Sequence, residues 1–362
     1  MEWRTTGEDA CFVASNSRSG FYSNYREVFD RSEVDHVYAV KGGPGTGKSR
    51  FLREVAACGE RKGYHCEYIY CSSDPDSLDA VILSGKERTV ALLDATAPHV
   101  YEPSHPGFRE EIVNLGDFWN AEKLIPHAAE IGELNREKAG AYRRAYRCLA
   151  AYGALSDNRD ALVAPFVRQE KIRELAARLL QNLPAGKKAE AIPALIRSIG
   201  MRGEIGFDTY FSMAEKCFLI EDCHGSAFYL MEEIRRIATE RKQKFRFSHD
   251  PAQPEKTDGI FFPESRTAFV VIPPEEVPGV LCRKISMRRF MDTAGMKDVR
   301  AELNFTARMC RALRTRTVEN LAEVRKLHFR VEDIYIGAMD FPAKEAFTKR
   351  FCERLFQMSA LS

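Results

Sequence analysis

Eight consecutive residues near the N-terminus have the types and spacing of a phosphate-binding loop. Glycines let a backbone curl until its N–H groups face an anion, and the N-terminus of a following helix favours the same negative charge. The lysine of such a loop can reach the β- and γ-phosphates, and its serine hydroxyl can ligate Mg²⁺. The motif therefore predicts binding of ATP with Mg²⁺. Its residues are Gly42, Gly43, Pro44, Gly45, Thr46, Gly47, Lys48 and Ser49.

The segments around this loop have the hydrophobic patterns that such a site needs. Residues 36–40 predict a buried strand before the loop, and residues 51–56 have helical spacing after it. Further strands are expected at 66–70 and at 89–94, the latter as the third strand of a parallel sheet. Its apolar run ends in Asp94, which is the Walker-B pattern. Asp94 would then hold Mg²⁺ together with Ser49, directly or through water.

The general base is less well defined by the sequence. No glutamate follows Asp94, and the candidates are His99 and three acids of the loop after the second strand, Asp74, Asp76 and Asp79. These acids also suit a turn or a helix cap. We predict Asp76 as the third catalytic residue beside Lys48 and Asp94.

Composition narrows the class of protein. The 362 residues are 44% hydrophobic and 29% charged, as in ordinary globular proteins. No apolar run reaches the roughly 18 residues of a membrane span, so no membrane partner is expected. Residues 1–6 do not begin a secretory signal, and the ten cysteines are scattered. A cytoplasmic protein with reduced thiols is therefore expected, without a disulfide framework.

The basic residues are unevenly distributed. The net charge is only +2, but residues 283–330 contain 13 Lys or Arg against 5 Asp or Glu. A basic helical segment of this kind is most often a solvated face. It can also bind an anionic partner, such as nucleic acid or a phosphorylated ligand.

The second half of the chain resembles the first. Residues 79–82 (Asp-Ala-Val-Ile) correspond to residues 258–261 (Asp-Gly-Ile-Phe) at an offset of 179, and residues 91–93 correspond to 270–272 at the same offset. In place of the phosphate-binding loop the second half has residues 221–228, which lack Gly-Lys-Ser.

This second loop is not expected to bind a nucleotide in the usual way. Glu221 and Asp222 would repel phosphate, and the offset puts Pro273 at the position of Asp94. The second half would instead act as a scaffold for the first site.

Apolar residues at helical spacing follow each α/β segment and predict a helical hairpin beside each core. Asp157-Asn158 is a possible turn within the first hairpin, and residues 337–342 a break within the second. The predicted fold is α/β, with two P-loop NTPase-type three-layer domains in tandem. The expected boundaries are 1–120 for the active core, 121–198 for a hairpin, 199–282 for the degenerate core and 283–362 for a second hairpin.

Four segments together resemble an uncharacterised bacterial family of tandem-repeat P-loop ATPases. They are residues 20–25 (Gly-Phe-Tyr-Ser-Asn-Tyr), the loop 41–49, the motif Cys71-x-x-Asp74-Pro75-Asp76-Ser77-Leu78-Asp79 and the run Asp94-Ala95-Thr96-Ala97-Pro98-His99. The similarity extends over essentially the whole chain and is densest over 12–130. It implies ATPase activity. In that family the second half often has its own intact loop, so the degenerate loop here argues against a two-site mechanism.

The sequence thus predicts an Mg-ATP-binding protein that hydrolyses ATP at its first half. Two alternatives stay open. A small-molecule kinase would use the acidic loop 74–79 at the acceptor position. A binding module would switch its interaction with a protein or nucleic acid according to the bound nucleotide.

Overall fold

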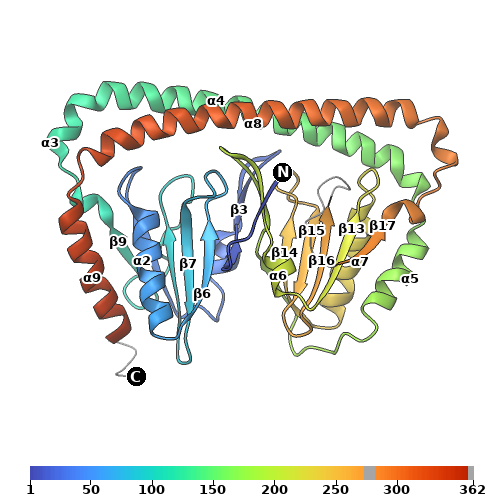
Figure 1. Cartoon of the computed structure of the whole chain (residues 1–362), viewed down its shortest axis with the longest axis horizontal. Coiled ribbons are helices and arrows are strands. Elements are labelled where there is room, and N and C mark those ends of the chain that lie inside the picture. Colours follow the sequence, from blue (N-terminus) through green and yellow to red (C-terminus); the bar gives the residue numbers. More distant parts are fainter. Residues whose placement is uncertain (273–281, 358–362) are drawn as a thin grey trace.

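The computed structural model describes residues 1–272 and 282–357. Two α/β cores lie side by side beneath a pair of long helices, α4 (Ala128–Val163) and α8 (Arg300–Ile336) (Figure 1). The chain builds the first core, crosses along α4 to build the second, and returns along α8 to the first. The last part of the chain therefore packs on the first core.

The first core is a six-stranded mixed sheet. One face packs under α2 (Lys48–Arg61), and the other packs on α1 (Tyr25–Phe29). From one edge to the other its strands are β2 (Asp9–Cys11), β6 (His65–Tyr70), β7 (Leu78–Ser84), β8 (Thr89–Asp94), β5 (His36–Lys41) and β9 (Glu110–Asn114).

The prediction of a parallel sheet is correct only in part. Strands β2 and β6 are parallel, as are β8, β5 and β9, but β7 runs antiparallel to both of its neighbours. The strand at 89–94 is therefore separated from β6 by a reversed strand. The reason is that residues 71–77 are too few for the crossover that parallel strands require, so the chain turns straight back.

The second core repeats this arrangement. Its strand order and strand directions are those of the first sheet, and α7 (Ala227–Glu240) takes the place of α2. The strands are β10 (Glu190–Pro193), β14 (Lys244–His249), β15 (Thr257–Phe262), β16 (Thr267–Ile272), β13 (Lys216–Glu221) and β17 (Arg283–Ser286).

Strand register corrects the predicted counterpart of Asp94. Asp94 lies opposite Val40 in the first sheet, and Val271 lies opposite Ile220 in the second. The fixed offset had pointed to Pro273, which is outside the described residues. The difference arises because the hairpin of β15 and β16 has four residue pairs, from Gly259–Val270 to Phe262–Thr267, whereas that of β7 and β8 has five, from Ala80–Leu93 to Ser84–Thr89. An apolar side chain thus occupies the carboxylate's position.

Two β-hairpins and the N-terminal strand lie between the cores. Phe12 stacks on Phe207 with ring centroids 4.6 Å apart, and Phe12 also forms a β-bridge with Leu195. The first strand pairs with the second hairpin, so the N-terminus joins the second half. The elements are β1 (Glu2–Arg4), the hairpin β3 (Ala14–Ser17) and β4 (Gly20–Ser23), the hairpin β11 (Arg197–Gly200) and β12 (Gly203–Phe207), and the short helix α6 (Thr209–Met213).

The helices do not form a separate hairpin beside each core. Helices α4 and α8 run antiparallel and pack on each other along their apolar stripes, for example Leu134 against Leu327. A helix of 36 residues is about 54 Å long and overshoots a single core. As a result α5 (Gln169–Leu179) packs on α7 of the second core, and α9 (Phe341–Gln357) packs on α2 of the first. A short helix, α3 (Ala121–Leu124), precedes α4.

The two predicted helix breaks have different outcomes. Helix α8 ends at Ile336 and α9 begins at Phe341, so the break at 337–342 is confirmed. The turn predicted at Asp157-Asn158 is wrong, because α4 continues to Val163. Asp157 lies on the helix surface, where its carboxylate accepts two hydrogen bonds from Arg18.

Cysteine pairing departs from the expectation of reduced thiols. Cys217 and Cys282 form a disulfide, with their Cα atoms 4.8 Å apart. The other eight cysteines are free thiols. No helix among residues 1–272 and 282–357 has the length and apolar character needed to traverse a bilayer.

Candidate functional site

The glycine-rich loop 42–47 connects β5 to α2, as predicted. Gly45 and Gly47 have φ values of +73° and +75°, a region that disfavours side chains, and α2 begins directly at Lys48. The Lys48 ammonium donates hydrogen bonds to the carbonyl oxygens of Gly42 (2.7 Å) and Gly43 (2.8 Å). The lysine side chain therefore bridges two backbone carbonyls of the loop and stabilises its tight turn.

Asp94 lies beside this lysine. Strands β5 and β8 are parallel neighbours, so their carboxyl ends meet at one edge of the sheet, and Asp94 Oδ2 is 3.6 Å from Lys48 Nζ. Asp94 Oδ1 accepts a hydrogen bond from the Thr96 amide at 2.8 Å. Ser49, in the first turn of α2, accepts one from the Leu78 amide at 2.9 Å. The hydroxyl and the carboxylate are oxygen donors of the kind that Mg²⁺ prefers.

The last turn of α8, which comes from the second half of the sequence, covers the loop. A Cβ atom at Gly45 would lie 2.8 Å from the carbonyl oxygen of Glu332 and 3.1 Å from Ile336 Cγ1. Burial raises the pKa of Glu332, and the nearby Asp74 and Asp333 raise it further. Burial lowers the pKa of His328, as does the neighbouring Lys138. The sequence did not predict this contact, because the spacing of apolar residues in the last turn of α8 is the same as in any packed helix.

The acidic loop after β6 is held by arginines from elsewhere in the chain. Arg202, in the turn between β11 and β12, pairs with Asp74 at 3.0 Å and also with Asp76. Arg4 pairs with Asp76 at 2.6 Å. Within the described part of the chain no contact joins Asp76 to Lys48. The structure thus brings Lys48 and Asp94 together and places Asp76 in an ion-pair cluster between the halves.

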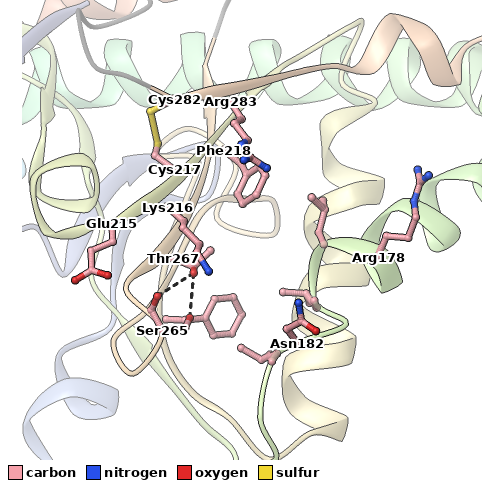
Figure 2. Close-up of a pocket in the computed structure, with 14 residues that line it drawn as sticks. Arg178, Asn182, Glu215, Lys216, Cys217, Phe218, Ser265, Thr267, Cys282 and Arg283 are labelled. Atoms are coloured by element: carbon pink, nitrogen blue, oxygen red, sulfur yellow. Dashed lines mark hydrogen bonds between the residues drawn. A yellow bond between two sulfur atoms is a disulfide. The ribbon is translucent and has the colours of Figure 1, made fainter.

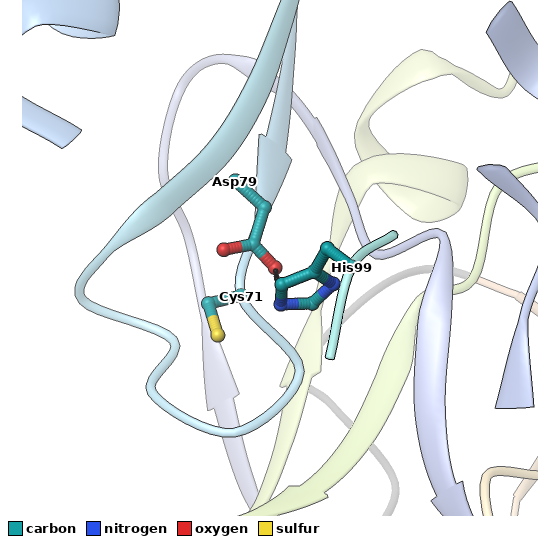
Figure 3. Close-up of side chains that lie close together, drawn as sticks. All are labelled: Cys71, Asp79 and His99. Carbon is teal, nitrogen blue, oxygen red and sulfur yellow. Dashed lines mark ion pairs between the residues drawn. The ribbon is translucent and has the colours of Figure 1, made fainter. Parts of the chain in front are cut away.

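A compact cluster of Cys71, Asp79 and His99 lies at the same edge of the sheet (Figure 3). Asp79 Oδ2 is 3.2 Å from His99 Nε2, and both side chains are buried. Burial raises the pKa of Asp79 to about 6, with the charge of Asp94 adding to the rise and His99 opposing it. The Tyr25 ring stacks on the His99 ring at 5.2 Å. These residues come from the two motifs that also supply Asp76 and Asp94.

The corresponding loop of the second core is closed by its own carboxylate. Asp222 accepts hydrogen bonds from the Gly225 amide (2.7 Å) and the Ala227 amide (2.8 Å) at the start of α7. That is the position at which a helix N-terminus would hold an anion. A cavity of about 220 Å³ beside it is lined by residues of both charges, including the buried pair Arg197 and Asp258.

Another cavity, of about 660 Å³, lies at the other end of the strands of the second sheet, away from the loop that corresponds to 42–49 (Figure 2). It is lined by residues at the amino ends of β13 and β17, among them Lys216, Phe218 and Arg283, and by the disulfide Cys217–Cys282. None of the predicted site residues lines it. The candidate site is therefore the loop edge of the first sheet.

Comparison with protein-family models, curated proteins and solved structures finds no match to this chain.

Proposed function

We propose that the first core binds Mg-ATP and hydrolyses it. One observation carries this proposal: Lys48 begins a helix directly after a glycine-rich loop and lies 3.6 Å from Asp94 at the end of the adjacent parallel strand. The arrangement offers a cation and backbone amides for phosphate oxygens, with hydroxyl and carboxylate oxygens for the metal. The glycines at 45 and 47 leave the backbone open to close approach.

The chain's own residues have separate roles in this proposal. Lys48 would exchange its two loop carbonyls for β- and γ-phosphate oxygens and stabilise the charge that develops there. Ser49 and Asp94 would hold Mg²⁺, which would supply positive charge to neutralise the phosphate oxygens. A water oxygen would attack the γ-phosphorus and the bond to the β–γ bridging oxygen would break, with ADP as the leaving group and the proton of the water passing to the released phosphate.

In this proposal the second core is a scaffold that does not bind a nucleotide. Its loop has Ala227 where α2 starts with Lys48, and Asp222 already satisfies the amides at the helix N-terminus. A phosphate would have to displace this carboxylate against like-charge repulsion. We therefore expect one nucleotide per chain.

Replacing Lys48 by alanine tests the proposal. We expect the wild type to bind one ATP and release phosphate, and Lys48→Ala to lose at least about 100-fold in turnover, because a charge-stabilising donor is removed. Calorimetry with ATP and Mg²⁺ would give affinity and stoichiometry, and a phosphate-release assay would give turnover. Lys62→Ala, an exposed cation just past the other end of α2, is the matched control. Tight ATP binding without phosphate release by the wild type would contradict hydrolysis, and no binding would contradict the whole proposal.

A second candidate function is supported by the upper surface of the molecule. Residues 138–156 of α4 and 303–318 of α8 contain no Asp or Glu, and both stretches contribute to one apolar cluster between these helices. We call the arginines along them the basic ridge. Its members are Arg143, Arg144, Arg147, Arg308, Arg311 and Arg316. Arg316 pairs with Glu319 at 2.7 Å, whereas the other five arginines form no ion pair within the described residues. A row of arginines suits a phosphate backbone, so an ATP-gated nucleic-acid-binding module is the second candidate.

Salt dependence of DNA binding would test this second candidate. We expect a labelled DNA duplex to bind, and replacement of Arg143, Arg147, Arg308 and Arg311 by glutamine to reduce the slope of log affinity against log salt by about 4. An equal number of exposed cations away from the ridge serves as the control, with Arg61, Lys62, Lys187 and Lys188 changed to glutamine. Equal losses in both variants, or no binding by the wild type, would exclude a specific role for the ridge.

A further inference from the structure

Three side chains with soft and hard donor atoms converge beside the phosphate-binding loop. Cys71 follows β6, Asp79 lies in β7, and His99 lies in the segment after β8. Their sulfur, oxygen and nitrogen atoms all lie within 4.8 Å of one another (Figure 3). We propose that Cys71, Asp79 and His99 bind one zinc ion, at a site separate from the magnesium site of Ser49 and Asp94.

The spacing of the donor atoms suits tetrahedral zinc. Bonds of about 2.0–2.3 Å to oxygen, nitrogen and sulfur keep neighbouring ligand atoms about 3.3–3.6 Å apart. The Asp79 Oδ2 to His99 Nε2 distance of 3.2 Å is already close to that value. With all three donor atoms within 4.8 Å, a movement of about 1 Å by the Cys71 thiol completes the set. In Figure 3 the other ring nitrogen of His99 points away from Cys71 and Asp79, so Nε2 is the ligand atom.

The donor chemistry selects a thiophilic metal over magnesium. A thiolate and an imidazole favour zinc, whereas magnesium prefers an all-oxygen shell. One thiolate, one carboxylate and one neutral imidazole would balance the charge of a dication, which matters because Asp79 and His99 are buried. Coordination to the metal would deprotonate the Cys71 thiol.

The surroundings fit a metal that keeps an open position. Three protein ligands leave a fourth position for water, the pattern of catalytic rather than purely structural zinc. The Tyr25 hydroxyl and His99 Nδ1 are buried polar groups without a hydrogen-bond partner within the described residues. The Tyr25 ring stacks on the His99 ring with centroids 5.2 Å apart, so Tyr25 is part of the wall of this cluster.

Zinc at this position would join the two loops that border the nucleotide site. Next to Asp79, the Leu78 amide donates to the Ser49 hydroxyl. Three residues before His99, Thr96 donates through its hydroxyl to the Gly42 carbonyl oxygen (2.8 Å) and through its amide to Asp94. A metal that fixes Asp79 and His99 therefore also restrains Ser49 and Asp94.

Cobalt substitution tests the site directly. The purified full chain, reduced and stripped with a chelator, would be titrated with Zn²⁺ by calorimetry and with Co²⁺ by absorption spectroscopy. We expect one ion per chain and a thiolate-to-cobalt charge-transfer band. We expect the Cys71→Ser variant to lose the charge-transfer band. We also expect Cys71→Ser and His99→Gln each to weaken metal affinity by about 100-fold or more, because changes even outside the ligand shell cost about 10–100-fold.

Two controls separate this site from its neighbours. Cys148→Ser, a half-buried free thiol on α4, should retain the band, and Lys48→Ala should retain zinc while losing ATP. Zinc binding is therefore measured independently of nucleotide binding. A wild type that shows no thiolate band, or a Cys71→Ser variant that keeps it, would overturn the proposal, and the wild-type spectrum alone decides if a variant does not fold.

Discussion

Replacing Asp94 by asparagine is expected to slow phosphate release about 100-fold or more while changing Mg²⁺-free ATP affinity little. The substitution preserves size, and its amide oxygen can still accept the hydrogen bond from the Thr96 amide. It removes the negative charge that lies 3.6 Å from Lys48 and that would hold the metal. Loss of one preorganised electrostatic group of this kind costs about 10²–10³ in turnover.

The decisive measurement for Asp94 is phosphate release against Mg²⁺ concentration. In the Asp94→Asn variant we expect the curve to shift to higher Mg²⁺ as well as to fall. Glu87→Gln, in the turn at the opposite end of β8, is the matched control and should behave as the wild type. Turnover and Mg²⁺ dependence that are both unchanged would remove Asp94 from the site. Asp76→Asn in the same assay would test the predicted catalytic role of that residue.

Replacing Arg246 by methionine is expected to destabilise the protein by about 3–5 kcal/mol. Arg246, in β14 of the second core, donates from Nη1 to both carboxylate oxygens of Asp9 in β2 of the first core, at 2.7 and 2.8 Å. Both side chains are buried. Removing the arginine would leave the Asp9 carboxylate buried between the cores, with His65 as the one nearby cation among the described residues.

Urea unfolding would measure this loss, with Arg236→Met as the control. Arg236 pairs with Glu233 and Glu240 on the exposed surface of α7, and its loss should cost less than about 1 kcal/mol. The double variant Asp9→Asn/Arg246→Met should be less destabilised than the sum of the single variants, because the uncompensated charge is gone. Equal effects of Arg246→Met and Arg236→Met would contradict a buried ion pair between the cores.

The pH dependence of this destabilisation has a defined sign. Burial alone would raise the pKa of Asp9, but Arg246 and His65 outweigh it and hold the pKa below its usual value. The ion pair therefore stabilises the folded state above about pH 4, the ordinary range for aspartate, and this contribution is lost as the pH falls through the lowered pKa. The difference between the wild type and Arg246→Met should be greatest near neutral pH and shrink below about pH 4.

Much of the first core could be predicted because its signals are local. The loop 42–49, the strand before it, the helix after it and the strand ending in Asp94 each depend on residues close in sequence. All four were found where expected. The break after Ile336 is local for the same reason, since glycine and proline disfavour a continuing helix.

Features that depend on distant contacts could not be predicted in this way. The reversed strand β7 and the counterpart of Asp94 both depend on connection lengths and strand register, which a constant offset of 179 does not resolve. The placement of Asp76 depends on Arg4 and Arg202, which are remote in sequence. Helices α4 and α8 were assigned to separate hairpins because an apolar stripe does not identify its partner.

The sequence by itself determined the chemistry that the first core can offer: a glycine-rich curl, a lysine at a helix start, and a carboxylate at a strand end. These are properties of short segments, whose backbone preferences and hydrophobic periodicity act locally. The tertiary structure alone decided what surrounds that chemistry. It placed the last turn of α8 on Gly45, brought Cys71 and Asp79 to His99, and paired Arg246 with Asp9. Each of these contacts joins separate elements of the fold, so it exists only once the two cores and their crossing helices are packed.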